Sequence, residues 1–357
     1  MPCILISGLP YEVLSSRFQL HEPALLLAKP FSARQLAACL PRRFAMPRFS
    51  RALLLALAML LGHIGCQAAE LRAIGVSLTN MGNPFFTQIA RGVEAAARRL
   101  GGPGVKVYAS SCAYDLQRQI GQLERFIDLK VDMIVVSAVD PEAVRPVLDR
   151  ARAAGIRVIA VDVVAGGVDA TVMTDNLDAG RQACEFVAQR LKGQGSMVIV
   201  NGPHLSSVID RVQGCFEVLR RYPAIHVLSS DRDAGGSTPG GFVAMTELLS
   251  KYPRIDAVFT INDPTALGAE EAAGQSKRKE FFIVSVDGSP RVFARMQAAD
   301  SLIAASVAQR PSLQAQKAVD IGFALLEGGA APKQTLLIPA FVVTRETRQW
   351  PEGAWRE

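Results

Sequence analysis

Short apolar runs rich in valine and isoleucine alternate with amphipathic segments through most of this chain, and this alternation restricts the fold more than any other feature. Continuous apolar runs are typical of parallel strands that are buried on both faces of a sheet. Strands are predicted at residues 73–78, 105–109, 133–137, 158–162, 197–201, 226–230, 257–261, 282–287 and 303–308. Helices are predicted between them, at residues 84–100, 117–129, 141–154, 179–191, 211–221, 246–251 and 312–326. The pattern predicts an α/β protein with doubly wound parallel sheets.

The part of the chain from residue 70 onward has about 290 residues, which is enough for two domains of ordinary size. Seven of the 39 basic residues and two of the 33 acidic residues precede residue 69, so most of the net charge of +6 belongs to that N-terminal part. The remainder is close to neutral, and no basic stripe indicates binding to nucleic acid. Beyond residue 69, no apolar run reaches the roughly 20 residues that a membrane-spanning helix needs.

Residues 46–69 have the three parts of a secretory signal peptide in the required order. Two arginines form a basic start, residues 52–61 form a short apolar region, and Ala68 and Ala69 are small residues suited to cleavage. We therefore predict export to the periplasm, with cleavage near Ala68 and a mature chain that carries no membrane anchor.

The cysteines indicate neither a disulfide framework nor a zinc site. The residues up to Cys66 partly resemble the motif that precedes a lipidated cysteine. His63 stands where that motif usually has leucine, so cleavage without lipidation is favoured. Cys112, Cys184 and Cys215 follow in the body of the chain. In an oxidising compartment Cys184 and Cys215 are able to form a disulfide, and they are equally suited to remain buried thiols. The sequence leaves both alternatives open.

Residues 1–45 stand before the signal peptide, although an export signal normally begins a chain, and Met46 is therefore an alternative start. Two short apolar runs and the pair Lys29-Pro30 within residues 1–42 resemble the last third of a response-regulator receiver domain. The resemblance includes no acidic pocket and no phosphoacceptor aspartate. It suggests, at most, a neighbouring two-component system.

Polar residues and a proline follow several of the predicted strands, at Asn83-Pro84, Asp140-Pro141, Asn262-Asp263-Pro264 and Asp287-Gly288-Ser289-Pro290. Asparagine and aspartate accept hydrogen bonds from the free N–H groups that begin a helix, and proline suits the first helical turn, so capping explains part of this pattern. The same junctions lie at the carboxyl ends of parallel strands, where open α/β sheets bind their ligands. They are therefore candidate ligand contacts as well as caps.

These motifs, in this order, resemble the ribose-binding type of periplasmic binding protein, which is the type 1 class. The resemblance rests on Ile74-Gly75-Val76-Ser77, Asn83-Pro84-Phe85-Phe86, Asp162, Thr174-Asp175-Asn176, Asn262-Asp263, Val286-Asp287-Gly288 and Ala308-Gln309. It implies two similar lobes joined by three strands that cross near Thr174-Asp175, Gln309-Arg310 and Ile338-Pro339. By this resemblance the N-terminal lobe comprises residues 70–174 and 310–338, the C-terminal lobe comprises residues 175–309 and 339–350, and residues 351–357 form a tail.

The resemblance also implies a ligand site between the lobes. Its predicted members are Ser77, Asn83, Phe85, Phe86, Asp162, Asn262, Asp287 and Gln309. Carboxylates and amides form hydrogen bonds with hydroxyl groups, and an aromatic face covers the C–H side of a sugar ring. Phe85 and Phe86 are also suited to the core, and at least one of them is expected to belong partly to it. Asp162 and Asp287 are harder to explain as core residues, because an unpaired buried carboxylate is costly.

Three positions depart from the pattern of the sugar-binding members. Val163 stands where those members carry an arginine directly after the first-lobe aspartate, and the alignment places Ile209 at the position of a second arginine and Gly236 near an aromatic residue. Each sugar oxygen that is buried without a partner costs about 1 to 3 kcal/mol. The sequence therefore predicts a small, neutral, polar ligand with fewer oxygens than ribose.

The resemblance implies the substrate-binding component of an ABC sugar importer, which closes over its ligand and delivers it to membrane permease subunits. A periplasmic partner of a membrane histidine kinase is the alternative with the same fold. A DNA-binding repressor with a domain of this kind is opposed by the signal peptide, by the near-neutral body and by the absence of a helix-turn-helix segment. No common catalytic motif is present, so we expect a monomeric binding protein without enzymatic activity, cofactor or metal.

Overall fold

The computed structural model describes residues 3–7, 24–28, 70–330, 335–348 and 355. The chain divides into two units, Met1–Ala68 and Ala69–Glu357. In the first unit, β1 (Cys3–Ser7) pairs in parallel with β2 (Ala24–Ala28). The predicted signal peptide at 46–69 lies outside the described residues, as does the rest of the receiver-like segment.

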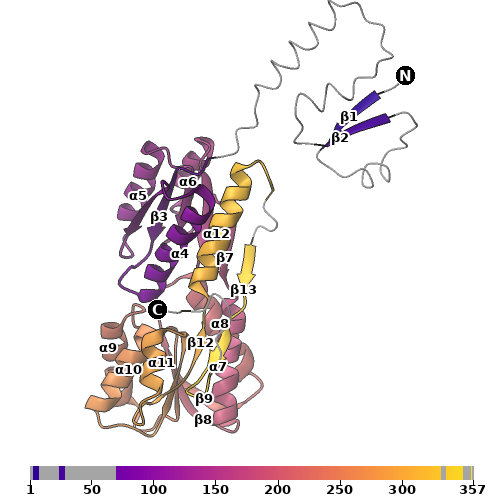
Figure 1. The fold of residues 1–357 in the computed structure, drawn as a ribbon. Helices are drawn as coiled ribbons and strands as arrows, with labels where there is room; N and C mark the ends of the chain where they lie inside the picture. Colours follow the sequence, from indigo (N-terminus) through magenta and orange to yellow (C-terminus); the bar gives the residue numbers. More distant parts are fainter. Residues whose placement is uncertain (1–2, 8–23, 29–69, 331–334, 349–354, 356–357) are drawn as a thin grey trace, which may run out of the picture. The chain divides into compact units, whose positions relative to one another are not determined.

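The second unit contains two six-stranded sheets, each covered by helices, and these form the two lobes visible in Figure 1. The first sheet has the strand order β13-β7-β6-β5-β3-β4, with every neighbouring pair parallel. Its strands are β3 (Ala73–Leu78), β4 (Lys106–Ser111), β5 (Met133–Val136), β6 (Arg157–Val161), β7 (Ala170–Thr174) and β13 (Thr335–Ile338). Its helices are α4 (Pro84–Gly101), α5 (Leu116–Asp128), α6 (Arg145–Ala153) and α12 (Pro311–Leu326).

The second sheet has the order β14-β12-β11-β10-β8-β9, and only the edge strand β14 is antiparallel to its neighbour. Its strands are β8 (Gln194–Asn201), β9 (Ala224–Asp233), β10 (Ala257–Thr260), β11 (Phe282–Asp287), β12 (Ile303–Ala308) and β14 (Phe341–Val343). Its helices are α7 (Asn176–Arg190), α8 (Ser206–Leu219), α9 (Thr238–Lys251), α10 (Asp263–Gln275) and α11 (Pro290–Met296). Two similar doubly wound lobes confirm the predicted fold class.

The chain passes between the two sheets at three points, after β7, after β12 and between β13 and β14. Two of these passages are joined directly, because the backbone N–H of Asp175 donates to the carbonyl of Ile338 over 2.9 Å. The C-terminal helix α12 returns to the first lobe, where it lies beside α4 in Figure 1 and Gln88 Nε2 donates to Ser312 Oγ over 2.8 Å. Most of the second lobe is therefore inserted between two pieces of the first, and β14 completes the second sheet after β13.

Continuous apolar strands place alternate side chains in cores on opposite faces of each sheet. In β5, Met133 and Val135 belong to the core beneath α4 and α12, whereas Ile134 and Val136 belong to the core beneath α5 and α6. In the second lobe Val258 of β10 lies in a different core cluster from its neighbours on the strand. Burial on both faces is the reason why these strands lack polar alternation.

Several predicted boundaries were wrong. Helix α8 begins at Ser206, five positions before the predicted start at residue 211, and α9 begins at Thr238, eight positions before the predicted 246. In α9 the pair Gly240 and Gly241 resembles a helix breaker. A β-carbon on Gly241 would lie 2.4 Å from the carbonyl oxygen of Thr265, so glycine is needed there for close packing against α10. Strands β7, β13 and β14 and helices α10 and α11 were not predicted as elements.

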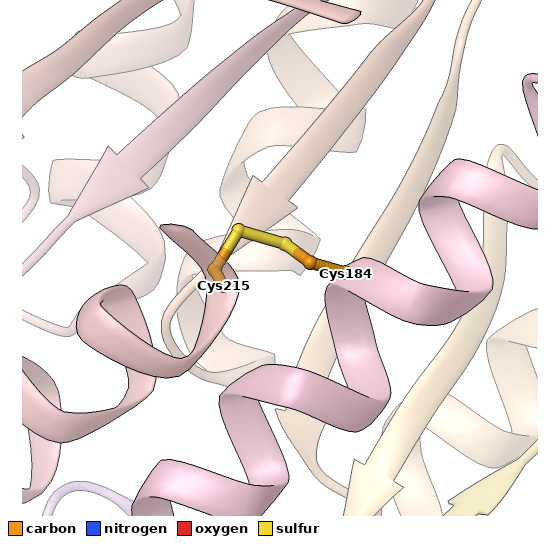
Figure 2. Close-up of a disulfide and its surroundings, with 2 residues drawn as sticks. All are labelled: Cys184 and Cys215. Atoms are coloured by element: carbon orange, nitrogen blue, oxygen red, sulfur yellow. A yellow bond between two sulfur atoms is a disulfide. The ribbon is translucent and has the colours of Figure 1, made fainter. Parts of the chain in front are cut away.

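The two alternatives for Cys184 and Cys215 are resolved, because the structure joins these residues in a disulfide between α7 and α8 (Figure 2). Their α-carbons are 4.9 Å apart, within the range that a disulfide requires. The helices approach closely because a β-carbon on Gly180 would clash with the backbone of Arg211, and one on Gly214 with that of Leu177. Cys112 is buried and unpaired in the described part of the chain.

Among the described residues, no helix is both long enough and apolar enough to cross a membrane. The same residues contain no group of three histidine, cysteine, aspartate or glutamate side chains arranged to hold a metal ion.

Candidate functional site: the cavity between the lobes

A cavity of about 30 Å³ lies where the two lobes meet the hinge. Seven of the eight site residues predicted from the sequence line it, and they come from both lobes. They are Asn83, Phe85, Phe86, Asp162, Asn262, Asp287 and Gln309. The other lining residues are Tyr114, Pro203, Leu205, Ser207, Val208, Arg211, Gly236 and Ile261.

Ser77 does not line this cavity, although it was predicted to be a ligand contact. It is fully buried in β3, where its hydroxyl donates to Gln122 Oε1 over 2.8 Å and accepts from Gln119 Nε2 over 3.3 Å. These glutamines belong to α5, so the Ser77 side chain connects strand and helix within the first lobe.

Asn83 and the two phenylalanines begin helix α4 at the edge of the cavity. Asn83 Oδ1 accepts from the N–H of Phe85 over 3.0 Å, as the predicted helix cap requires, and this leaves the amide N–H groups as donors for a ligand. Phe85 and Phe86 are both buried in the first-lobe core and lie edge to face with ring centroids 5.2 Å apart. They serve as core residues and as cavity walls at once.

Asp162 supplies a carboxylate to which no described residue donates a hydrogen bond. It follows β6 directly, is 4% exposed, and has a backbone φ of 68°, a conformation that non-glycine residues seldom adopt. Burial raises the pKa of Asp162 to about 6, and the nearby charge of Arg211 opposes that rise. Such strain and desolvation cluster at functional sites, which favours a role for this carboxylate in binding.

Arg211 is the cationic donor that the sequence prediction missed. It is 4% exposed, with Nε donating to Asn176 Oδ1 over 2.9 Å and Nη1 donating to the carbonyl of Ile261 over 2.8 Å. An arginine has five N–H donors, so several remain for a ligand. Ile209, which the sequence alignment placed at the position of that arginine, is 41% exposed and does not line the cavity.

The error at Arg211 follows from the misplaced start of α8. With the helix beginning at Ser206, Ser207 and Arg211 are four residues apart and share one helical face, which lines the cavity. The predicted helix began at residue 211, so Ser207 lay outside it and the two residues were not placed on one helical face. The i, i+4 spacing of Ser207 and Arg211 was the sequence feature from which their common face could have been predicted.

Asp287 supplies the second carboxylate, at the end of β11 in the other lobe. Its Oδ1 accepts from Gln309 Nε2 over 2.8 Å and its Oδ2 accepts from the N–H of Asp263 over 3.3 Å. Burial, and next the negative charge of Asp263, raise the pKa of Asp287 to about 8. The Asp263 carboxylate accepts from the hydroxyls of Ser285, Ser289 and Ser306 and from the N–H of Ser289, so it anchors the strands behind the cavity.

Gln309 connects the hinge to both lobes. Its Oε1 accepts from the hydroxyl of Thr174 over 2.6 Å, while its Nε2 donates to Asp287. Thr174 ends β7 in the first sheet, and its hydroxyl accepts in turn from Gln314 Nε2 over 2.7 Å. This chain of hydrogen bonds couples the orientation of the Asp287 carboxylate to the hinge.

Asn262 and Gly236 shape the wall of the cavity in the second lobe. Asn262 Oδ1 caps α10 by accepting from the N–H of Thr265, and its Nδ2 donates to the carbonyl of Gly236 over 2.9 Å. Gly236 has a φ of 61°, and a β-carbon there would lie 3.1 Å from Asn262 Nδ2. These two hydrogen bonds use one of the two donors and one of the two acceptor positions of the Asn262 amide, so half of its capacity remains for a ligand.

Tyr114 is a second residue that the sequence prediction missed. It lies in the loop between β4 and α5, at the carboxyl edge of the sheet, with positive φ both at Ala113 (52°) and at Tyr114 (60°). Burial, together with the charge of Asp162, raises the pKa of Tyr114 to about 12, so the phenol stays neutral at physiological pH. An aromatic residue just beyond a strand end was the signal for this position.

The lobes also touch through apolar side chains beside the cavity. Val163 is 1% exposed and belongs to a core cluster that includes Leu205, Val208 and Ile261 from the second lobe. Next to it, the N–H of Val164 donates to Ser206 Oγ over 3.1 Å. In place of a charged donor, Val163 thus contributes an apolar contact that holds the lobes together.

Two lobes that meet at a hinge over a cavity with a buried carboxylate on each side define a protein that binds a small polar molecule. Residues 74–330 match the family model described as "Periplasmic binding protein domain", and the chain belongs to this family. Members of the family bind solutes and catalyse no reaction, which confirms the prediction that the chain is not an enzyme.

Individual relatives agree with the family assignment. The chain is 30% identical over 278 residues to the ribose import binding protein of Bacillus subtilis, covering 76% of this chain and 87% of the relative. It is 31% identical over 238 residues to a xylitol-binding protein of Mycolicibacterium smegmatis, covering 64% and 67%. Among solved structures, an ABC transporter solute-binding protein from Agrobacterium vitis with bound allitol has a TM-score of 0.69 at 26% identity, covering 77% of this chain and 96% of that chain.

Proposed function

We propose that this chain captures a neutral polyhydroxylated molecule, a sugar or a polyol, in the periplasm and delivers it to the permease subunits of an ABC importer. The pair Asp162 and Asp287 carries the proposal, because the two carboxylates line one cavity from opposite lobes. A ligand whose hydroxyls form hydrogen bonds with the side chains of both Asp162 and Asp287 binds the closed arrangement of the lobes better than an open one, and it therefore favours closure. The relatives named for ribose import and for xylitol support this ligand class.

Arg211 changes the kind of ligand that we expect. The sequence indicated a cavity without cationic donors, and hence a ligand poorer in oxygen than ribose. Arg211 and the Asn83 amide together offer N–H donors beside the carboxylate acceptors. The donors and acceptors at this site therefore match the hydroxyl groups of a fully hydroxylated pentose, hexose or polyol, and the proposed ligand need not have fewer oxygens than ribose.

A panel of D-ribose, D-allose, L-arabinose, xylitol, ribitol and myo-inositol should contain at least one compound that stabilises the protein. Ligand at about 100 times its dissociation constant adds about 2.7 kcal/mol to the free energy of unfolding, which raises the melting temperature by several degrees. Differential scanning fluorimetry measures this shift. Deoxy sugars and small amine oxides serve as comparison compounds, and stabilisation by these alone would contradict the proposed ligand class.

Transport and sensing differ in what happens to the bound compound. If the chain serves an importer, deleting its gene should abolish uptake of the radiolabelled compound, and the wild-type gene should restore uptake. An Asp162→Asn variant should not restore it. A partner of a sensor kinase would instead change transcription while uptake through a constitutively expressed permease continued.

The export prediction has its own test in cell fractionation. We expect a shortened form that begins near Ala69 in the periplasmic fraction, with Cys184 and Cys215 protected from thiol reagents by their disulfide. A Leu55→Arg variant, which interrupts the apolar region of the signal, should remain in the cytoplasm at full length. Fatty-acid labelling at Cys66 or an intact cytoplasmic wild type would contradict the prediction.

A further inference from the structure

A second and larger chamber adjoins the cavity between the lobes. Its volume is about 320 Å³, and it shares Asn83, Gly236 and Asp287 with the inner cavity. A volume of this size lies within the range of small-molecule sites, whereas about 30 Å³ is close to the volume of one water molecule. The outer chamber therefore provides most of the space available at the site.

The ring of Trp355 lines this outer chamber although the residue lies near the end of the chain. Trp355 is 7% exposed and packs in the first-lobe core, with its ring centroid 6.2 Å from that of Phe85 and the planes 32° apart. Phe85 in turn lies edge to face with Phe86. The three rings form a continuous aromatic wall from the inner cavity to the outer chamber.

No hydrogen bond to a described residue holds the indole in place, since Nε1 is buried without a partner. Buried indole N–H groups usually have one. Gly236 lines the same chamber without a side chain, and Trp355 is the one aromatic residue among the described residues that line it. Prolines 84, 239 and 264 and Leu267 make up the remaining apolar lining. The polar lining consists of Asn80, Asn83, Ser237, Thr238, Asp287, Ser289 and Arg291, which are able to bind the hydroxyl groups of a ligand whose C–H face lies on Trp355.

We infer that Trp355 is a specificity-determining residue that packs against the C–H face of a ring-shaped ligand and so selects cyclic sugars over open-chain polyols. This inference rests on the proposed function and refines its ligand class. A flat indole matches a ring that presents several C–H groups on one side. An open-chain polyol has no such fixed face, and it loses conformational freedom when it is ordered against one.

The test measures dissociation constants by calorimetry for three cyclic probes, D-ribose, D-allose and myo-inositol, and for two open-chain probes, xylitol and ribitol. In Trp355→Ala, the affinity for the tightest cyclic probe should fall about 10- to 30-fold, while the affinity for the open-chain probes changes less than about threefold. Trp355→Phe retains a ring and should restore the cyclic probe to within about threefold of wild type. Because the selectivity ratio is taken within one variant, partial loss of folded protein does not alter it.

Fluorescence provides a second measurement, because Trp350 and Trp355 are the two tryptophans of the chain. In Trp350→Phe, binding of the cyclic probe should shift the emission of Trp355, whereas Trp355→Phe should show no comparable shift. Wild-type binding with unchanged selectivity in Trp355→Ala would overturn this inference and leave the proposed function intact. If neither these five probes nor L-arabinose bound the wild type, both would be overturned.

Discussion

Replacing Asp162 with asparagine is expected to weaken ligand binding about 100-fold. Hydrogen bonds to a charged acceptor contribute about 1.5 to 3 kcal/mol each, and each 1.4 kcal/mol is a factor of ten in affinity. Because no described residue donates to the Asp162 carboxylate, both oxygens remain available to ligand hydroxyls. Calorimetry with the best compound of the panel measures the loss directly.

The same substitution should raise the stability of the ligand-free protein at neutral pH. The pKa of Asp162, about 6, lies above the value of an aspartate in an unfolded chain, so the folded state holds the proton more tightly. The contribution of Asp162 to the free energy of unfolding of the wild type is therefore fully present below pH 4, and it is lost as the pH rises to about 6. We expect similar melting temperatures for variant and wild type at pH 4, and a variant that melts a few degrees higher at pH 7.5.

Asp140→Asn is the matched control for this pair of measurements. Asp140 also follows a strand of the first sheet, but it is exposed and caps the N–H groups of Glu142 and Ala143, which asparagine also caps. It should leave binding and the pH profile unchanged. If Asp162→Asn lowered affinity and stability together by the same free energy, the aspartate would have a structural role instead.

Removing the disulfide by Cys184→Ala and Cys215→Ala together is expected to lower the free energy of unfolding by about 3 to 4 kcal/mol. The two residues are 31 positions apart, and the loop that they close restricts the unfolded chain. For a protein of this size the loss corresponds to a fall of roughly 10 °C in melting temperature. Ligand affinity should change little, because the disulfide connects α7 and α8 within the second lobe and does not line the cavity.

Cys112→Ala is the control, since it removes a buried thiol without breaking a cross-link. A reducing agent should destabilise the wild type and the Cys112→Ala variant and leave the double variant unaffected. Equal stability of the double variant and the wild type would show that the disulfide does not form in the folded protein.

Local sequence patterns account for the parts of the site that lie next to strand ends. Asp162 and Asp287 follow the apolar runs that form β6 and β11, and in a doubly wound sheet this position places them at the ligand edge. Asn83 and Asn262 were identified by the same reasoning, and both cap helices as well as lining the cavity. The prediction that residues of both lobes line one site came from the order of the motifs along the chain, which resembles that of a known family. No single motif predicts it.

The sequence by itself therefore determined the class of fold, the alternation of most of its strands and helices, and the strand-end positions of the two carboxylates, because these depend on local periodicity and on the topology of parallel sheets. Only the tertiary structure placed Arg211 and Tyr114 at the cavity, directed Ser77 into its own lobe and brought Trp355 against Phe85. These contacts depend on the packing of segments far apart in the chain. The hydrophobic pattern specifies which residues are buried but not which buried residues meet.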